Sequence, residues 1–144
     1  MPQRMKYAPT LLWTALCLTA GCSHFDQRWQ SASSQPQSGI EGRWKGQWVS
    51  EVDGHSGPIS CAVSREGPNT YLASFSGTFW EIFPFQYDAT LHGQSNDGQV
   101  NLSGAQDLGI PMGVFYYMGH AEDDRFYLTY RSQYDGGHFV MTRP

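Results

Sequence analysis

The sequence is poor in positive charge. Among 144 residues, Lys and Arg total 9 against 13 Asp and Glu, which gives a net charge of −4. A nucleic-acid-binding protein normally carries a basic patch, so no nucleic-acid partner is expected. Charged residues make up only 15% of the chain and aromatic residues another 15%, the reverse of a disordered composition. The 16 Gly and 8 Pro are more than a helical bundle tolerates.

The apolar segment near the N-terminus is too short to span a bilayer. Residues 7–20 are uncharged over 14 positions, whereas a membrane-spanning helix takes about 20 apolar residues. Arg4 and Lys6 precede this segment, and small residues follow it. This order is typical of a secretory signal peptide.

The end of that segment, Leu18-Thr19-Ala20-Gly21-Cys22, resembles the lipobox of bacterial lipoproteins, although Thr19 stands where the family usually has Leu. The resemblance implies cleavage before Cys22 and acylation of its thiol, which would anchor the protein to a lipid bilayer. It divides the chain into a signal peptide (1–21), a lipidated cysteine with a flexible Ser/Gln-rich linker (22–38) and a domain (39–144). Ser23 after the cysteine favours the outer membrane of a bacterial cell envelope, facing the periplasm.

Cysteine is scarce as well. The three cysteines are Cys17, which leaves with the signal peptide, Cys22, and Cys61. One remaining thiol excludes an intramolecular disulfide. Cys61 lies in a strand-like run, so a buried, unreactive thiol is expected.

No stretch of ten or more residues in the domain shows helical periodicity. Short runs of alternating polarity separated by Gly, Asn and Asp turns predict strands instead. The predicted strands are residues 43–50, 59–64, 71–80, 85–92, 99–103, 113–120, 126–131 and 138–143. Short connections favour sequential antiparallel pairing. We therefore predict an all-β fold, an antiparallel up-and-down barrel of about eight strands, with a β-sandwich as the alternative.

The start of the domain, Gly42-Arg43-Trp44 and then Gly46-Gln47-Trp48, resembles the opening of the lipocalin and avidin-type calycin barrels. Those barrels place a basic residue of the last strand over the first-strand Trp. The resemblance implies that Trp44 and Arg143 form a barrel-closing pair. The helix that follows the lipocalin barrel is missing, because the printed chain stops at Pro144.

Large aromatic side chains alternate with small residues on the faces expected to point inward. Such a set fits either a packed core or the wall of a ligand cavity. The candidate ligand-binding residues are Trp48, Tyr71, Phe75, Phe79, Tyr116, Phe126 and Tyr130.

Catalytic and metal-binding patterns are absent from the sequence. No His-x-x-x-His or Cys-x-x-Cys pair occurs, and the spacing of His120 and His138 gives no reason to expect a metal or haem there. We therefore predict no cofactor and no enzyme activity. The function expected is a membrane-anchored exported lipoprotein whose barrel binds a small apolar or aromatic ligand. The alternative is a structural or protein-interaction lipoprotein with a solid barrel; no protein partner is identified.

Overall fold

A computed structural model describes residues 23–33 and 39–144. The predicted signal peptide and Cys22, the predicted acylation site, lie outside the described residues.

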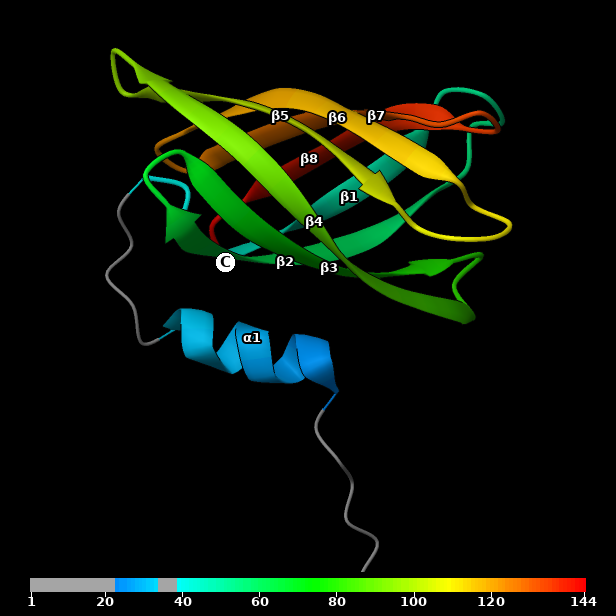
Figure 1. The fold of residues 1–144 in the computed structure, drawn as a ribbon. Coiled ribbons are helices and arrows are strands. Elements are labelled where there is room, and N and C mark those ends of the chain that lie inside the picture. The colour runs from blue at the N-terminus through cyan, green and yellow to red at the C-terminus, as the bar shows by residue number, and fades with distance from the viewer. Residues whose placement is uncertain (1–22, 34–38) are drawn as a thin grey trace, which may run out of the picture.

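Eight antiparallel strands pair in chain order and close into one barrel (Figure 1). This architecture confirms the predicted eight-stranded up-and-down barrel. The strands are β1 (Gly42–Ser50), β2 (Ser56–Gly67), β3 (Thr70–Phe79), β4 (Phe83–Asn96), β5 (Gln99–Asp107), β6 (Val114–Glu122), β7 (Arg125–Arg131) and β8 (Gly136–Thr142).

Pairing of β1 with β8 seals the barrel. Trp48 lies opposite Phe139 in this seam, and Gly46 lies opposite Met141. A Cβ atom at Gly46 would collide with the carbonyl oxygen of Val140, so only glycine allows the two strands to approach this closely. Closure leaves no unpaired sheet edge in the barrel.

Arg143 closes one end of the barrel. Its guanidinium carbon lies 3.9 Å from the centre of the Trp44 ring. Its two terminal nitrogens donate hydrogen bonds to the carbonyl oxygens of Glu41 (2.6 Å) and Gly39 (2.7 Å). Cation–π attraction and hydrogen bonding therefore act together at this end, which we call the closed end. The expected contact between Trp44 and Arg143 is present.

Helix α1 (His24–Ser33) occupies most of the segment that the sequence analysis assigned to a flexible linker. Ser23 and Asp26 explain where it begins: the Asp26 amide donates to the Ser23 hydroxyl (3.1 Å), and the Ser23 amide donates to the Asp26 carboxylate (3.2 Å). This reciprocal pattern is a capping box. The helix lies against the outside of the barrel along β1 to β3 (Figure 1).

Trp29 is the main contact of α1 with the barrel. The Arg43 guanidinium lies over its ring (4.8 Å) and donates to its carbonyl oxygen (2.7 Å). Arg28 adds an ion-pair contact with Asp88 of β4 at 3.6 Å. The prediction of a flexible linker over this segment is therefore wrong for His24–Ser33. The capping side chains and the contact of Trp29 with Arg43 stabilise a helix there.

We expect Arg143→Met to lower the free energy of unfolding by about 2 kcal/mol, because two charge-assisted hydrogen bonds and a cation–π contact are lost. Arg143→Lys should recover only part of this, since an ammonium lacks the planar fork that reaches both carbonyl oxygens. Urea unfolding measures the difference. Arg131→Met is the matched control, because Arg131 is exposed on β7, and equal losses for both residues would contradict the closing role.

Cys61 is fully buried, and burial, followed by the nearby charge of Asp88, raises the pKa of its thiol well above the ordinary value. It is the only cysteine after residue 22, so a chain of residues 23–144 reports on one thiol. We expect this thiol to react with a disulfide reagent about a thousandfold more slowly in the folded chain than in urea, because reaction requires unfolding. Comparable rates would show that Cys61 is accessible.

Candidate functional site

Four chain connections surround the barrel end opposite Arg143. Residues 51–55, 80–82, 108–113 and 132–135 join β1 to β2, β3 to β4, β5 to β6 and β7 to β8. We call this the open end; it lies on the right of Figure 1. The three connections at the closed end are only two residues long, so the open end alone carries loops of some length.

A cavity of about 710 Å³ lies at the open end. Its volume falls in the range of small-molecule sites, about 300–1,000 Å³. The lining residues are Trp48, Phe79, Pro84, Phe85, Gln86, Tyr87, Leu108, Pro111, Met112, Phe115, Tyr130, Ser132, Tyr134, Asp135 and Phe139. The aromatic cavity therefore lies at the open end; a second cavity of about 490 Å³ lies beside Arg143 at the closed end, and no aromatic side chain lines it among the described residues.

Two groups of aromatic rings form much of the cavity wall, one on β1, β3 and β4 and the other on β6, β7 and β8. Phe79 of β3 contacts Trp48 of β1 and Phe85 of β4, with ring centres 5.0 and 4.6 Å apart. Tyr130 of β7 contacts Phe139 of β8 and Phe115 of β6, at 5.1 and 6.0 Å. Rings in these tilted, edge-on and offset arrangements stabilise one another and hold the wall in place.

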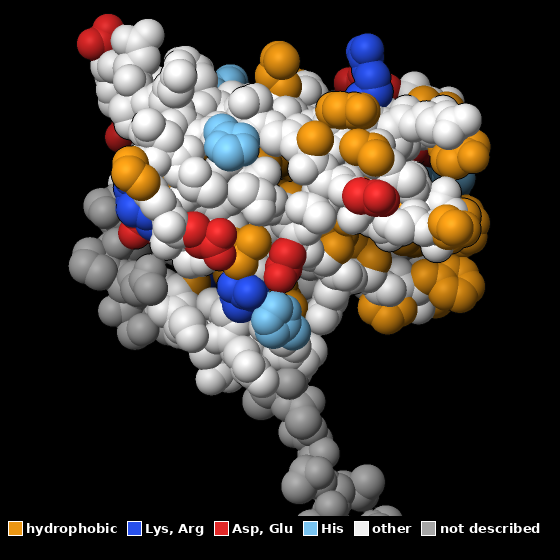
Figure 2. All heavy atoms as spheres, in the orientation of Figure 1, with side chains coloured by type: hydrophobic (Ala, Val, Ile, Leu, Met, Phe, Trp, Pro, Cys, Tyr) orange, Lys and Arg blue, Asp and Glu red, His pale blue; other side chains and the backbone are white. Residues whose placement is uncertain are grey.

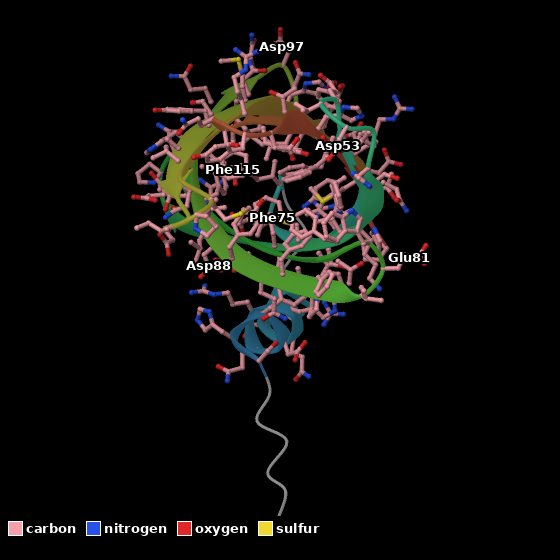
Figure 3. All side chains as sticks on the ribbon, turned by 90° about the vertical axis from the view of Figure 1, so that its right-hand side faces the viewer. Asp53, Phe75, Glu81, Asp88, Asp97 and Phe115 are labelled. Atoms are coloured by element: carbon pink, nitrogen blue, oxygen red, sulfur yellow. The ribbon has the colours of Figure 1, made fainter. Side chains whose placement is uncertain are left out.

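Phe75 lies deeper in the barrel, below the cavity. Its ring centre is 5.2 Å from those of both Tyr87 and Phe139, two residues of the cavity wall. Viewed from the open end, Phe75 and Phe115 point into the barrel interior, whereas Asp53 and Glu81 lie at its periphery (Figure 3). The aromatic wall thus continues into the packed core.

Among residues 23–33 and 39–144, Asp135 is the one carboxylate in the cavity wall, and no Lys or Arg lines it. The carboxylate accepts hydrogen bonds from the Ser50 hydroxyl (2.6 Å), the Gly136 amide (2.8 Å) and the Tyr130 hydroxyl (3.1 Å). Burial, followed by the Asp135 charge, raises the pKa of Tyr130 above its ordinary value. Tyr130 therefore stays protonated and donates to Asp135, and the wall offers no cation to an anionic ligand.

Two further tyrosines lie where the cavity meets the core. Burial raises the pKa of both Tyr87 and Tyr117, and each affects the titration of the other. The enclosed Tyr117 hydroxyl has no well-formed hydrogen bond. Burying a hydroxyl without a hydrogen bond costs free energy. The Tyr117 hydroxyl is such a group, and it lies in the deep part of the barrel.

The predicted ligand residues divide between the wall, the core and the surface. Trp48, Phe79 and Tyr130 line the cavity. The remaining inward residues belong to the core: Phe75 lies below the cavity, Phe126 contacts Trp44 at 5.3 Å, and Tyr71 lies under the Arg65 guanidinium at 4.9 Å.

The prediction that Tyr116 lines the barrel interior is wrong. The Tyr116 side chain lies on the outer wall with 61% of its surface exposed. Its neighbours Phe115 and Tyr117 point inward instead. The run from Val114 to Met118 is apolar at every position, so it lacks the alternation that distinguishes the two faces of a strand.

Sequence reasoning missed several wall residues: Phe85, Tyr87, Leu108, Met112, Phe115 and Phe139. Phe85 and Tyr87 alternate with the polar residues Gln86 and Asp88, which was an available signal for an inward face. Leu108 and Met112 belong to a connection, and only the folded loop brings them over the barrel mouth.

His120 and His138 lie on the outer wall, on either side of the Tyr127 ring, with ring centres 5.8 and 5.7 Å away. Within residues 23–33 and 39–144, no group of three His, Cys, Asp or Glu side chains is placed to hold a metal ion. At the open end His55 contacts Asp53 at 2.9 Å, and this hydrogen bond is the main cause that lowers the pKa of Asp53 to about 2.

The geometry defines a small eight-stranded barrel with an apolar cavity at one end. A scan against protein-family models and searches of curated proteins and of solved structures found no match to this chain. In the part of the chain that the structure describes, no helix is long and apolar enough to cross a membrane.

We expect the free energy of unfolding to fall as the pH rises above about 10, the ordinary pKa of tyrosine. Tyr130 ionises in the unfolded chain from that pH, but its folded-state pKa is raised, so the stabilisation present below pH 10 is lost as the pH rises. Tyr130→Phe should reduce the slope by up to about 1.4 kcal/mol per pH unit. Urea midpoints across this range measure the slope; the exposed Tyr134→Phe is the control, and an unchanged slope for Tyr130→Phe would contradict the burial of this hydroxyl.

Proposed function

We propose that the barrel binds a small apolar or aromatic molecule in the cavity at its open end. The observation that carries this proposal is the cavity of about 710 Å³ walled by two groups of aromatic rings. A barrel of eight strands is wide enough either to be filled by side chains or to hold one small ligand. The unfilled open end supports the second case.

The charge of the cavity wall disfavours an anionic ligand. In the part of the chain that the structure describes, the wall has one carboxylate, Asp135, and no Lys or Arg. An anionic ligand would leave water without a positive partner and would meet the Asp135 charge, which costs free energy. A neutral ligand, or one with a positive group that lies over the rings and near Asp135, meets no such penalty.

The cellular setting of the proposal rests on the sequence. A short basic segment, an apolar segment, small residues and Cys22 follow one another in the order of a lipoprotein signal. We propose that Cys22 is acylated and that the barrel is held at a membrane of the bacterial cell envelope, with the outer membrane favoured by Ser23. Two or more acyl chains anchor a protein stably.

A protein-interaction role is the alternative. The outer wall of β6, β7 and β8 exposes Tyr116, Met118, Tyr127 and Val140, and exposed apolar side chains on one side of a protein are typical of an interaction site. This role does not need the cavity, so ligand binding and the outer wall are separable by mutation.

The ligand proposal is tested with N-phenyl-naphthylamine, a neutral apolar dye that becomes fluorescent in apolar surroundings. We expect residues 23–144 to bind one dye molecule. Met112→Asp should weaken binding about tenfold or more, because it puts a charge in the apolar cavity wall. Met118→Asp is the matched control, since it makes the same change on the outer wall.

Two results would contradict the proposal. One is the absence of saturable dye binding to a folded chain. The other is equal loss of affinity in Met112→Asp and Met118→Asp, which would locate the dye outside the cavity. Circular dichroism confirms that both variants keep the barrel.

A further inference from the structure

Exposed apolar side chains are concentrated around the mouth of the cavity. Eight large apolar side chains of the described residues are more than half exposed, and six of these lie at the open end. We define the apolar rim as these six residues, Val52, Trp80, Ile82, Phe83, Ile110 and Tyr134. Figure 2 shows apolar side chains gathered at the corresponding end of the molecule.

The apolar rim is a ring rather than a local patch, because each of the four connections supplies at least one member. Ile110 is fully exposed at the tip of the β5–β6 connection, and Ile82 is 69% exposed at the end of the β3–β4 connection. The closed end has no such residue: its connections are Pro68-Asn69, Asp97-Gly98 and Asp123-Asp124. Apolar side chains exposed on one end only indicate a surface that is covered in use.

The charge of the rim indicates what covers it. The four connections contain Glu51, Asp53, Glu81 and Asp135 but neither Lys nor Arg, and the one basic residue directly next to them is the exposed Arg131 at the end of β7. Carboxylates therefore outnumber cations at this end. An anionic lipid surface would be repelled, because binding to such a surface relies on basic residues. An uncharged lipid interface fits better, since Trp and Tyr side chains such as Trp80 and Tyr134 favour that region.

The start of the described chain lies near the same end. The Ser23 hydroxyl is 3.4 Å from the side-chain nitrogen of Gln86. Gln86 lines the cavity and stands three residues along β4 from Phe83 of the rim. The proposed acylation site, Cys22, directly precedes Ser23 in the sequence. An anchor at that position and the apolar rim can therefore meet one bilayer.

We propose that the apolar rim docks on a lipid surface with uncharged or zwitterionic headgroups, so that the cavity mouth faces the bilayer. An apolar ligand would then pass between the membrane and the cavity without crossing water. The ligand part of this inference rests on the proposed function, but docking itself needs neither the ligand nor the acyl anchor, and the test omits both.

The test uses residues 23–144, which include every described helix and strand and the complete barrel core. We expect this chain to sediment with phosphatidylcholine vesicles and to bind less to vesicles rich in phosphatidylglycerol. The double variant Ile82→Asp/Ile110→Asp should lower the bound fraction about tenfold, because two rim side chains lose their favourable transfer into the interface. Met118→Asp changes a residue of the outer wall that is as exposed as Ile82, and this variant should bind as the parent chain does.

A second measurement uses the tryptophans and does not depend on the charged variants. Phosphatidylcholine brominated in its acyl chains should quench the emission of Trp80 in the rim. Trp80→Phe should remove most of this quenching, and Trp29→Phe on α1 should leave it unchanged.

Several results would overturn the proposal: no binding to phosphatidylcholine, stronger binding to the anionic vesicles, equal losses for the double variant and Met118→Asp, or quenching that survives Trp80→Phe. Self-association of the free chain that the double variant abolishes would also overturn it, in favour of a second copy on the rim. Ile82 and Ile110 do not line the cavity, so dye binding by the double variant should equal that of the parent. A parent chain that binds phosphatidylcholine vesicles but not the dye would reject the ligand proposal alone.

Discussion

Closure of the sheet between β1 and β8 is the constraint on which the rest of the structure depends. Once these strands pair, eight strands enclose an interior of fixed width, and each inward side chain either fills that interior or lines a hollow. Trp44, Phe126 and Met141 fill the closed end. Arg143 then covers it through the Trp44 ring and two backbone carbonyl oxygens. The open end has no corresponding plug, and the cavity lies there.

The two ends differ in chemistry as well as in packing. Short polar connections and Arg143 mark the closed end, while longer connections with exposed apolar tips mark the open end. Burial of apolar surface is the main favourable term in folding, and exposing Ile82 or Ile110 adds nothing to the folded state. The exposed apolar residues of the rim surround a cavity that is itself apolar. This arrangement links the proposed ligand of the cavity to the proposed lipid surface on which the rim docks.

The strands and the closing pair were predictable from sequence because both depend on local patterns. Alternation marks the inward faces of β1, β3 and β7, and a tryptophan near the start and an arginine near the end of the domain match a known barrel arrangement. Tyr116 was placed wrongly because its strand is apolar on both faces. Helix α1 was missed because polar composition suggested a linker, although Ser23 and Asp26 already formed a capping signal. The cavity wall could not be predicted in full, since Leu108, Met112 and Asp135 reach it from connections whose paths depend on the closed barrel.

Native mass spectrometry of residues 23–144 shows whether the barrel is hollow and occupied by a ligand. The chain is directed to the periplasm with a cleavable signal in place of residues 1–22, and its native and denatured masses are compared. We expect a discrete additional mass that leaves on denaturation and belongs to an apolar molecule that is neutral or positively charged. An anionic occupant would contradict the proposed ligand class. A bare native mass that also stays unchanged after incubation with excess N-phenyl-naphthylamine would contradict the binding function itself.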